Sequence, residues 1–498
     1  MKKELFIEFL QEMCNVGFLT ELSKITDNLS RRVVVDKALD LTNEEIEDVL
    51  NTEDLKTKAI KLYLHTYSEE LDNDVKKLIK DNINKNVSYV MPLIAKFKEA
   101  RRNDVFNFME AILDREDEYM IASLSEIMKN VNVYKRDDAF ELLKIVLPAK
   151  EEYQIDYVKE TLECNTLINS DDEFRILKLI ANAKSDVHAE ALCDMATNDN
   201  LLERSDALEL FELVANAKEE YQARCGAELT TDEETLMDDR LLEHLKIILN
   251  ADTEYHAEYA SSILTDPDSL QREDIVDFVN VIMNTKGGFQ AGFASDVARE
   301  PDVLKKDDAL DFVKVVANAK EDYLANYASK AACHSNIIEH DKALDIVTII
   351  ANANELYQAE YAFEIAKKAV VRNEEKAVEI VDKVSKLKKQ YQAQCIDMLT
   401  DYAKITSRND ILTQIDEVIN AKNKEHALRT VKKIIKKCNT KDKNAKIVNE
   451  KPIEIIEEKS ISDLVRLKSY IEVINIVNNQ DIEEINSKTI VKVKTIKK

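Results

Sequence analysis

The chain has 498 residues, 33% of them charged and 45% hydrophobic, which allows a large buried core and argues against wholesale disorder. Glycine and proline number only five each, and this scarcity argues against folds rich in strands and loops, so we expect a nearly all-α protein. The formal net charge of −26 at pH 7 disfavours contact with nucleic acid and lipid headgroups and favours basic partners.

The first 70 residues predict helices that do not follow the spacing found later in the chain. They open with MKKELFIEFLQEM, where Glu4, Glu8 and Glu12 interrupt the apolar core that a secretory signal needs. No run approaches roughly 18 apolar residues, and the seven cysteines form no CxxC pair, which indicates reduced thiols and a cytoplasmic protein. We expect residues 1–70 to form an irregular helical N-terminal cap and residues 71–104 a degenerate first repeat.

Residues 105–438 repeat a two-helix pattern every 34 residues, ten times without an insertion. A unit of this length cannot bury its apolar face alone and must stack on its neighbours. We therefore expect a right-handed α-solenoid of about ten 34-residue helix-turn-helix repeats. The column that sets the period holds Tyr119, Tyr153, Val187, Tyr221, Tyr255, Phe289, Tyr323, Tyr357, Tyr391 and Glu425.

Polar residues mark the ends of the predicted helices. Asn stands between the two helices in seven copies, and we expect it to end the first helix in the left-handed conformation and to cap the second. Asn318, for example, is followed three residues later by Glu321, as in a capping box. An Asp precedes the first helix in seven copies, as at Asp308, where a carboxylate can cap free N–H groups.

A base stands two positions before this Asp in six copies, as Arg272 does before Asp274. The charge signs are reversed in two copies, at positions 238 and 240 and at positions 374 and 376. These copies keep one acid and one base at the two positions, although either residue can come first. We therefore predict a structural ion pair, which contributes about 0–1 kcal/mol if it is exposed.

The second helix of each copy carries residues such as Tyr323 and Tyr327 at i, i+4 spacing, which predicts that both rings pack in the core. The position after the first aromatic is polar, and we expect it to hydrogen-bond a neighbouring repeat; the alternative is that it holds the backbone of a bound peptide. This position holds Gln154, His188, Gln222, His256, Gln290, Gln358, Gln392 and His426.

A two-helix unit of 34 residues is similar to the tetratricopeptide repeat, whose period is the same. The resemblance covers about two-thirds of the chain and rests on period and helix pairing. The family's Trp-x2-Leu-Gly-x2-Tyr signature is absent, and the chain contains no Trp. The resemblance implies a scaffold that holds proteins or peptides on an extended curved face.

No pattern in the chain predicts catalysis, so we expect a protein that is not an enzyme and has no cofactor. The glycines at 287, 288 and 292 lack the Lys-Ser/Thr of a phosphate loop. Cys333, His334 and His340 lack the second ligand pair that zinc sites usually have, so we expect no metal site.

One acidic column in the first helices is the best candidate for a binding site. Because stacked helices lie roughly 10 Å apart, these carboxylates should form a line that a basic partner can contact. The alternative is a solvated face, partly neutralised by lysines at i+3 such as Lys144, Lys246 and Lys314. The column holds Glu141, Glu209, Glu243, Asp277, Asp311, Asp345 and Glu379.

The chain ends in a basic region, since residues 421–498 hold 19 Lys/Arg and 11 Asp/Glu. Residues 439–498 predict a polar linker, an amphipathic helix over 460–477 and a basic tail. We expect a non-catalytic protein–protein interaction scaffold or adaptor that presents an acidic surface to a protein or peptide with a basic surface. The alternative is a helical-repeat protein that binds nucleic acid through the basic C-terminal tail.

Overall fold

The computed structural model describes residues 4, 6, 17–26, 34, 36–52, 54–67, 71–163, 167 and 172–440. The chain divides into two units, Met1–Cys438 and Asn439–Lys498. The amphipathic helix predicted over 460–477 and the basic tail lie outside the described residues. Within the described residues every regular element is a helix, which confirms the all-α prediction.

The N-terminal part of the first unit consists of helices of unequal length. Up to residue 66, the described helices are α2 (Gly17–Ile25), η1 (Ala38–Asp40), α4 (Asn43–Leu50) and α5 (Leu55–Thr66). The segment predicted as a degenerate repeat holds α6 (Asn73–Asp81), α7 (Val87–Val90) and α8 (Pro92–Glu99). Thr42 and Glu45 form a capping box at the start of α4, and the Asp54 carboxylate accepts from the Thr57 amide at the start of α5.

From residue 105 onward two kinds of helix alternate along the chain. The first helices are α9 (Val105–Leu113), α12 (Ala139–Val146), α15 (Glu173–Ala181), α18 (Ala207–Ala215), α20 (Leu241–Ile248), α23 (Ile275–Met283), α26 (Ala309–Ala317), α29 (Ala343–Ala351), α31 (Ala377–Ser385) and α34 (Ile411–Ile419). The second helices are α10 (Glu118–Lys129), α13 (Glu152–Thr161), α16 (Asp186–Ala196), α19 (Glu220–Thr231), α21 (Glu254–Leu264), α24 (Gly288–Ala298), α27 (Asp322–Ala332), α30 (Leu356–Arg372), α32 (Gln390–Thr400) and α35 (Lys424–Thr440).

Short helical turns connect one pair of helices to the next. Most of these turns bury one or two apolar side chains, as Leu201, Val303 and Ile337 show, whereas η4 buries none. The turns are α11 (Val131–Tyr134), α17 (Asp199–Leu202), η3 (Thr235–Met237), α22 (Pro267–Leu270), α25 (Pro301–Leu304), α28 (Ser335–Ile338), η4 (Glu374–Lys376) and α33 (Ala403–Thr406).

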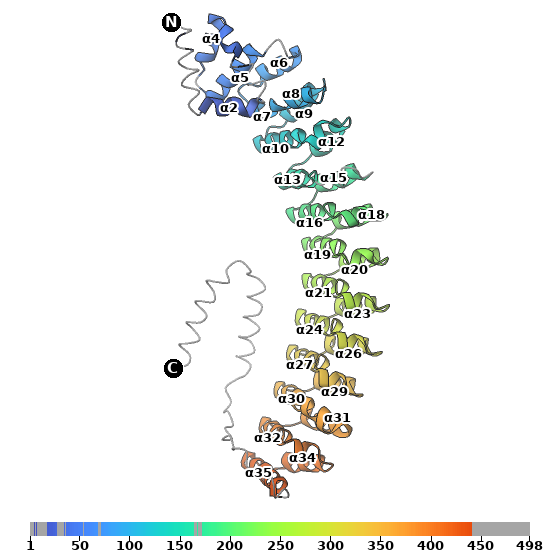
Figure 1. Cartoon of the computed structure of the whole chain (residues 1–498). Helices are drawn as coiled ribbons and strands as arrows, with labels where there is room; N and C mark the ends of the chain where they lie inside the picture. Colours follow the sequence, from blue (N-terminus) through green and yellow to red (C-terminus); the bar gives the residue numbers. More distant parts are fainter. Residues whose placement is uncertain are drawn as a thin grey trace. The chain divides into compact units, whose positions relative to one another are not determined.

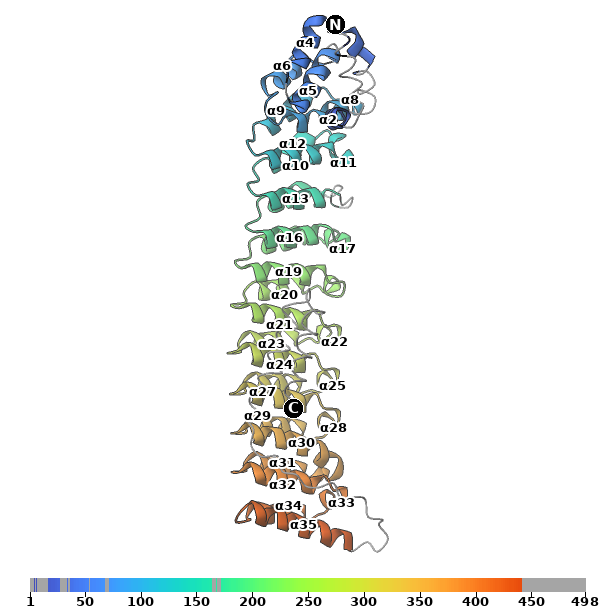
Figure 2. The ribbon, with the colours of Figure 1, turned by 90° about the vertical axis from the view of Figure 1, so that its left-hand side faces the viewer.

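The helices of residues 105–440 lie in two neighbouring rows, one of first helices and one of second helices (Figures 1 and 2). From α10 to α32, each second helix packs against the next second helix along the chain. From α13 onward to α32, each also packs against the first helix that follows it. The buried apolar side chains form one continuous cluster, to which first helices contribute fully buried rings such as Phe211, Phe278 and Phe312.

Buried amides and imidazoles join six of the second helices to the next repeat, as predicted. The Gln358 amide donates to the Leu387 carbonyl at 2.6 Å, and its oxygen accepts from the backbone N–H of Asn354 and Glu355. Gln154, Gln222 and Gln392 also donate their amides to a carbonyl of the next repeat. In His188 and His256, the ring Nε2 makes this contact in place of the amide. Gln290 differs, because its amide donates to the exposed Asp322 carboxylate.

The tyrosine column packs against the border of the core. The prediction that these rings lie within the core was wrong, because they are only partly buried. Tyr323 and Tyr327 are half-buried, whereas Leu324 and Ala325 beside Tyr323 are buried. A border position keeps the phenol hydroxyl within reach of backbone acceptors. The Tyr357 hydroxyl donates to the Leu387 carbonyl at 2.8 Å.

The predicted ion pair forms at most copies, and it also joins neighbouring repeats. The Arg272 guanidinium donates to both carboxylate oxygens of Asp274, at 2.7 and 2.9 Å, and this contact lowers the pKa of Asp274. Its remaining nitrogen donates to the Leu304 carbonyl in the next connecting turn at 2.6 Å. Arg240 pairs with Asp238 in the reversed order.

Several predicted end contacts are wrong. Lys306 with Asp308 and Glu374 with Lys376 form no ion pair, and Lys376 donates to the Asn409 carbonyl. The Asp residues before the first helices make no capping hydrogen bond, because their carboxylates are held mostly by the arginines. Asn318 ends α26 at φ −93°, outside the left-handed region, and its amide donates to the Lys314 carbonyl. The capping boxes instead pair positions such as Glu219 and Gln222.

The inter-repeat amide yields a stability prediction with a control inside the same chain. Replacing Gln358 with Ala leaves two backbone N–H groups without their partner and removes one of the two hydrogen bonds to the buried Leu387 carbonyl, which keeps the bond from Tyr357, so we expect a loss of about 2–3 kcal/mol. Gln290→Ala removes only an exposed contact and should cost less than about 0.5 kcal/mol. Urea unfolding followed by circular dichroism measures both; equal losses would contradict the role given to the buried amide.

Candidate functional site

The seven carboxylates of the predicted acidic column all lie exposed on first helices. They belong to α12, α18, α20, α23, α26, α29 and α31, and the last four of these helices pack one against the next. The column is interrupted between α12 and α18, where α15 carries Arg175, which pairs with Glu212 at 2.9 Å. The structure therefore places these residues on one row of helices, with a basic interruption.

Lysines neutralise part of the acidic column. Lys144 pairs with Glu141 at 2.8 Å and Lys314 with Asp311 at 3.4 Å within the same helix. Lys246 pairs with Glu209 of the preceding repeat at 3.2 Å. Among the described residues, no ion pair is formed by Glu243, Asp277, Asp345 or Glu379.

A shallow groove lies beside the acidic column, between α23 and α26. Asp277, Asn280 and Lys314 contribute to its lining, and its volume is about 410 Å³. The groove is open and polar, so carboxylates there remain well hydrated and contribute little to binding energy on their own.

A second set of carboxylates, on the second helices, was not predicted as a site. These residues lie three or seven positions after the position that holds the first aromatic of most repeats, so they share one helix face with the side chain at the fourth position. That side chain is a half-buried aromatic in α13, α21, α24 and α30. The i+3 and i+7 spacing beside the aromatics was the signal in the sequence that could have revealed them. The set comprises Asp156, Glu190, Glu258, Glu360, Glu126, Glu160, Asp194, Glu228, Asp296 and Glu364.

The carboxylates come together most clearly on α13 and α16, in a group we call the carboxylate–tyrosine patch: Tyr157, Glu160, Glu190 and Asp194. Asp194 is in contact with solvent, yet burial raises the pKa of its carboxyl, and the neighbouring charges of Glu190 and Glu160 raise that pKa further. Burial, Glu190 and other nearby acids raise the pKa of Tyr157 to about 12. Among the described residues, no base pairs with Glu160, Glu190 or Asp194. Within the described part of the chain, the patch therefore concentrates negative charge that no base neutralises.

A related group on α27, α30 and α32 is better compensated. Burial raises the pKa of Glu360, and Glu364 and Asp397 add to the effect. Lys368 bridges Asp397 and Asp401 at 2.6 Å each, and Lys367 pairs with Glu364 at 2.7 Å. Burial likewise raises the pKa of Tyr327 to about 12. Because lysines of the chain already occupy much of this group, the patch on α13 and α16 is the more open of the two.

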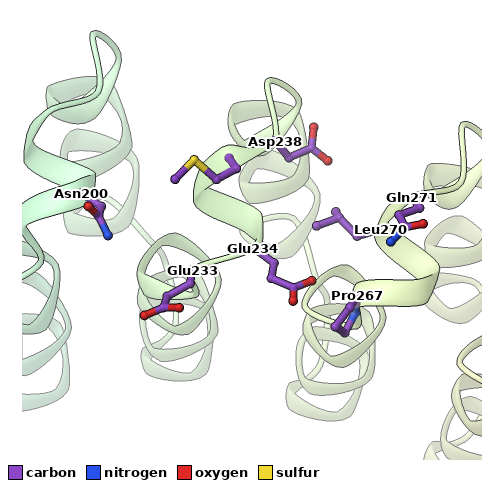
Figure 3. Close-up of a pocket in the computed structure, with 8 residues that line it drawn as sticks. Asn200, Glu233, Glu234, Asp238, Pro267, Leu270 and Gln271 are labelled. Carbon is purple, nitrogen blue, oxygen red and sulfur yellow. The ribbon is translucent and has the colours of Figure 1, made fainter.

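The connecting turns hold a further acidic pocket, of about 600 Å³, between α17, η3 and α22. Glu233, Glu234 and Asp238 line one part of it, and Pro267 and Leu270 lie across from them (Figure 3). Met237 also lines the pocket and is 79% exposed, although the equivalent position of other repeats is polar, as at Gln271 and Lys305. The pocket combines carboxylates with apolar surface, as the carboxylate–tyrosine patch does.

The residues considered for a metal site do not assemble into one. His340 uses both ring nitrogens, one against the Glu374 carbonyl at 3.1 Å and one accepting from the Lys342 N–H at 3.0 Å. No group of three or more potential metal ligands occurs in the part of the chain that the structure describes.

The raised pKa of Asp194 predicts a pH-dependent gain in stability for Asp194→Asn. Because the folded-state pKa lies above the ordinary value of 3.8, the ionised carboxylate destabilises the fold at neutral pH, and this penalty fades as pH falls below the folded-state pKa. We expect the variant to melt higher than the parent at pH 7 and level with it below about pH 3, under the unfolded-state pKa. Asp345→Asn, at an exposed position on α29, serves as the control and should change little at either pH. An unchanged melting temperature for Asp194→Asn at pH 7 would contradict the assignment.

Comparison with known proteins adds no family to this description. No protein-family model matches the chain, and no curated protein sequence matches it significantly. Within the described residues, none of the helices has the length and apolar character needed to cross a membrane. The candidate function therefore depends on the geometry and charge of the molecule itself.

Proposed function

We propose that the chain is a non-catalytic interaction scaffold of the cytoplasm, an α-solenoid of about ten 34-residue repeats that binds a basic segment of a partner protein. The contact of each second helix with the next, and the single continuous core, support the solenoid arrangement. The buried thiols of Cys225 and Cys395 form no disulfide within the part of the chain that the structure describes, in keeping with a reducing compartment.

The carboxylate–tyrosine patch is the observation that carries the proposal. Three carboxylates of α13 and α16 lie close enough for Glu160 and Glu190 to raise the pKa of Asp194, and no base of the described chain pairs with them. A lysine or arginine from a partner relieves this repulsion, so binding is favoured by the removal of a penalty as well as by new contacts. The nearby ring of Tyr157 offers a cation–π contact to the same cationic group, worth about 0.5–1 kcal/mol at such a site.

The acidic column on the first helices takes a different part in this proposal. Its carboxylates are exposed, and three of the seven already pair with lysines. Exposed pairs contribute little affinity, but a surface of one sign accelerates the approach of an oppositely charged partner. We therefore assign to Glu141, Glu209, Glu243, Asp277, Asp311, Asp345 and Glu379 the role of steering basic partners, and to the patch the role of holding them.

Binding of a defined basic peptide tests the proposal. A labelled peptide of alternating Lys and Ser should bind the intact protein, with an affinity that falls as salt rises, and a Glu–Ser peptide should not bind. Glu190→Gln combined with Asp194→Asn should weaken binding about fivefold to tenfold, since two charge contacts are lost. The matched control, Asp277→Asn with Asp345→Asn, should change the dissociation constant by less than about twofold. Equal weakening by both double variants would show general attraction without a defined site.

Nucleic acid is the second candidate partner, because the C-terminal region of the chain is basic. Residues 421–498 hold 19 Lys/Arg against 11 Asp/Glu, whereas the preceding 420 residues hold 51 against 85. Single-stranded RNA should therefore bind the full chain weakly, and replacing Lys492, Lys494, Lys497 and Lys498 with Gln should abolish that binding. Submicromolar, salt-sensitive RNA binding that survives these replacements would favour nucleic acid over the basic peptide.

A further inference from the structure

His244 occupies a core position in α20. Its side chain is fully buried, with 0% exposure, and neither ring nitrogen has a hydrogen-bond partner. Buried polar atoms almost always have such a partner, so the exception requires an explanation. His188 and His256, which are buried on second helices, each bond a carbonyl of the next repeat through Nε2.

Comparison of the repeats indicates that packing does not require histidine here. The equivalent positions of the preceding repeat and of the next two repeats hold Leu210, Phe278 and Phe312, all of them fully or almost fully buried. An apolar side chain therefore fills this position elsewhere in the array. The imidazole adds a titratable group to a place where a hydrocarbon would give the same packing with no desolvation penalty.

The charged groups that act on the ring are few. Burial lowers the pKa of His244, and the fields of Asp238 and Glu243 oppose that effect while Arg240 adds to it. Helices α18, α19 and α21 pack against α20 and add no charge that acts on the ring. Their buried titratable groups include the Cys225 thiol, whose pKa burial raises to about 12, and His256. Asp238 and Glu243 act on the ring only through their fields, because neither carboxylate makes a hydrogen bond to it.

We propose that His244 makes α20 an acid-sensitive point in the repeat array, where protonation of the ring loosens the helix and its contacts with the next repeat. This regulation goes beyond the proposed binding function and does not rest on it. A charged imidazolium cannot remain in an apolar core without a partner, so the proton enters only when α20 opens.

Opening of α20 has a consequence for the neighbouring turn. Arg240, at the start of α20, donates to the carbonyls of Leu270 and Arg272 at 2.7 and 3.0 Å. Its partner Asp238 and the turn residue Leu270 both line the pocket between η3 and α22 (Figure 3). Loosening of α20 therefore releases the contacts that join this repeat to the next and alters the pocket.

The sign and the pH range follow from linkage. The unfolded-state pKa of histidine is about 6.5 and the folded-state value is lower, so the native state binds fewer protons than the unfolded state between the two values. The stability associated with the neutral ring is complete above about pH 6.5 and is lost as pH falls toward the folded-state pKa. Between about pH 7.5 and pH 5.5 the opening equilibrium should rise about tenfold.

Hydrogen exchange on the intact protein tests the proposal. We expect peptides covering α20 to lose about tenfold in protection factor between about pH 7.5 and pH 5.5, after correction for the intrinsic pH dependence of exchange. His244→Phe and His244→Leu, which copy the equivalent repeats, should remove this loss. The exposed His426, replaced with the Gln of other repeats, is the control and should leave the loss intact.

Two results would overturn the proposal. The first is protection of α20 that does not depend on pH in the parent protein. The second is a loss of protection that persists in both His244 variants, which would place the titrating group elsewhere. Two variants are used so that a packing defect in one of them does not decide the outcome.

Discussion

The structure depends on the burial of one helix pair by the next. A first helix such as α26 packs against its own second helix α27, against the preceding second helix α24 and against the neighbouring first helices α23 and α29, and its large apolar side chain Phe312 is almost fully buried. Burial of such side chains stabilises each by about 1.5–3 kcal/mol, and this gain exists only in the presence of a neighbour. The strict period of 34 residues follows from this requirement, because an insertion would displace the apolar face of one pair from that of the next.

Directional hydrogen bonds between neighbouring repeats fix how their apolar faces are aligned. The buried amide of Gln358 and the guanidinium of Arg272 each reach a backbone carbonyl of the following repeat, one beside the second helix and one in the connecting turn. Since these contacts have fixed directions, they select one register among the many that apolar faces alone would permit. The outward faces are then free to vary, and they carry the acidic column and the carboxylate–tyrosine patch. His244 is one position where a titratable side chain lies inside the core and makes no hydrogen bond.

Much of the fold could be predicted from periodicity, and the candidate site only in part. The 34-residue spacing predicted paired helices, and the Gln column and the Arg–Asp pairs were predicted correctly because their spacing has few alternatives. The depth of Tyr323 was misjudged, since i, i+4 spacing fixes a helix face but not how far that face extends into the core. The role of Asn318 was misjudged because its amide bonds the preceding turn of its own helix, which needs no left-handed residue. The carboxylate–tyrosine patch was missed because it joins side chains of two helices whose separation the sequence does not give.

Hydrogen exchange along the array of a Phe312→Ala protein tests the dependence of each helix pair on its neighbours most directly. Phe312 is almost fully buried in α26, and its loss should cost about 3–5 kcal/mol at that position. If neighbouring pairs stabilise one another, protection should fall most in α26 and α27, less in α24 and α29, and little in α12 and α34. A uniform fall from α9 to α34 would indicate one cooperative globule, and a fall confined to α26 would indicate pairs that are stable alone. Either result would contradict the account.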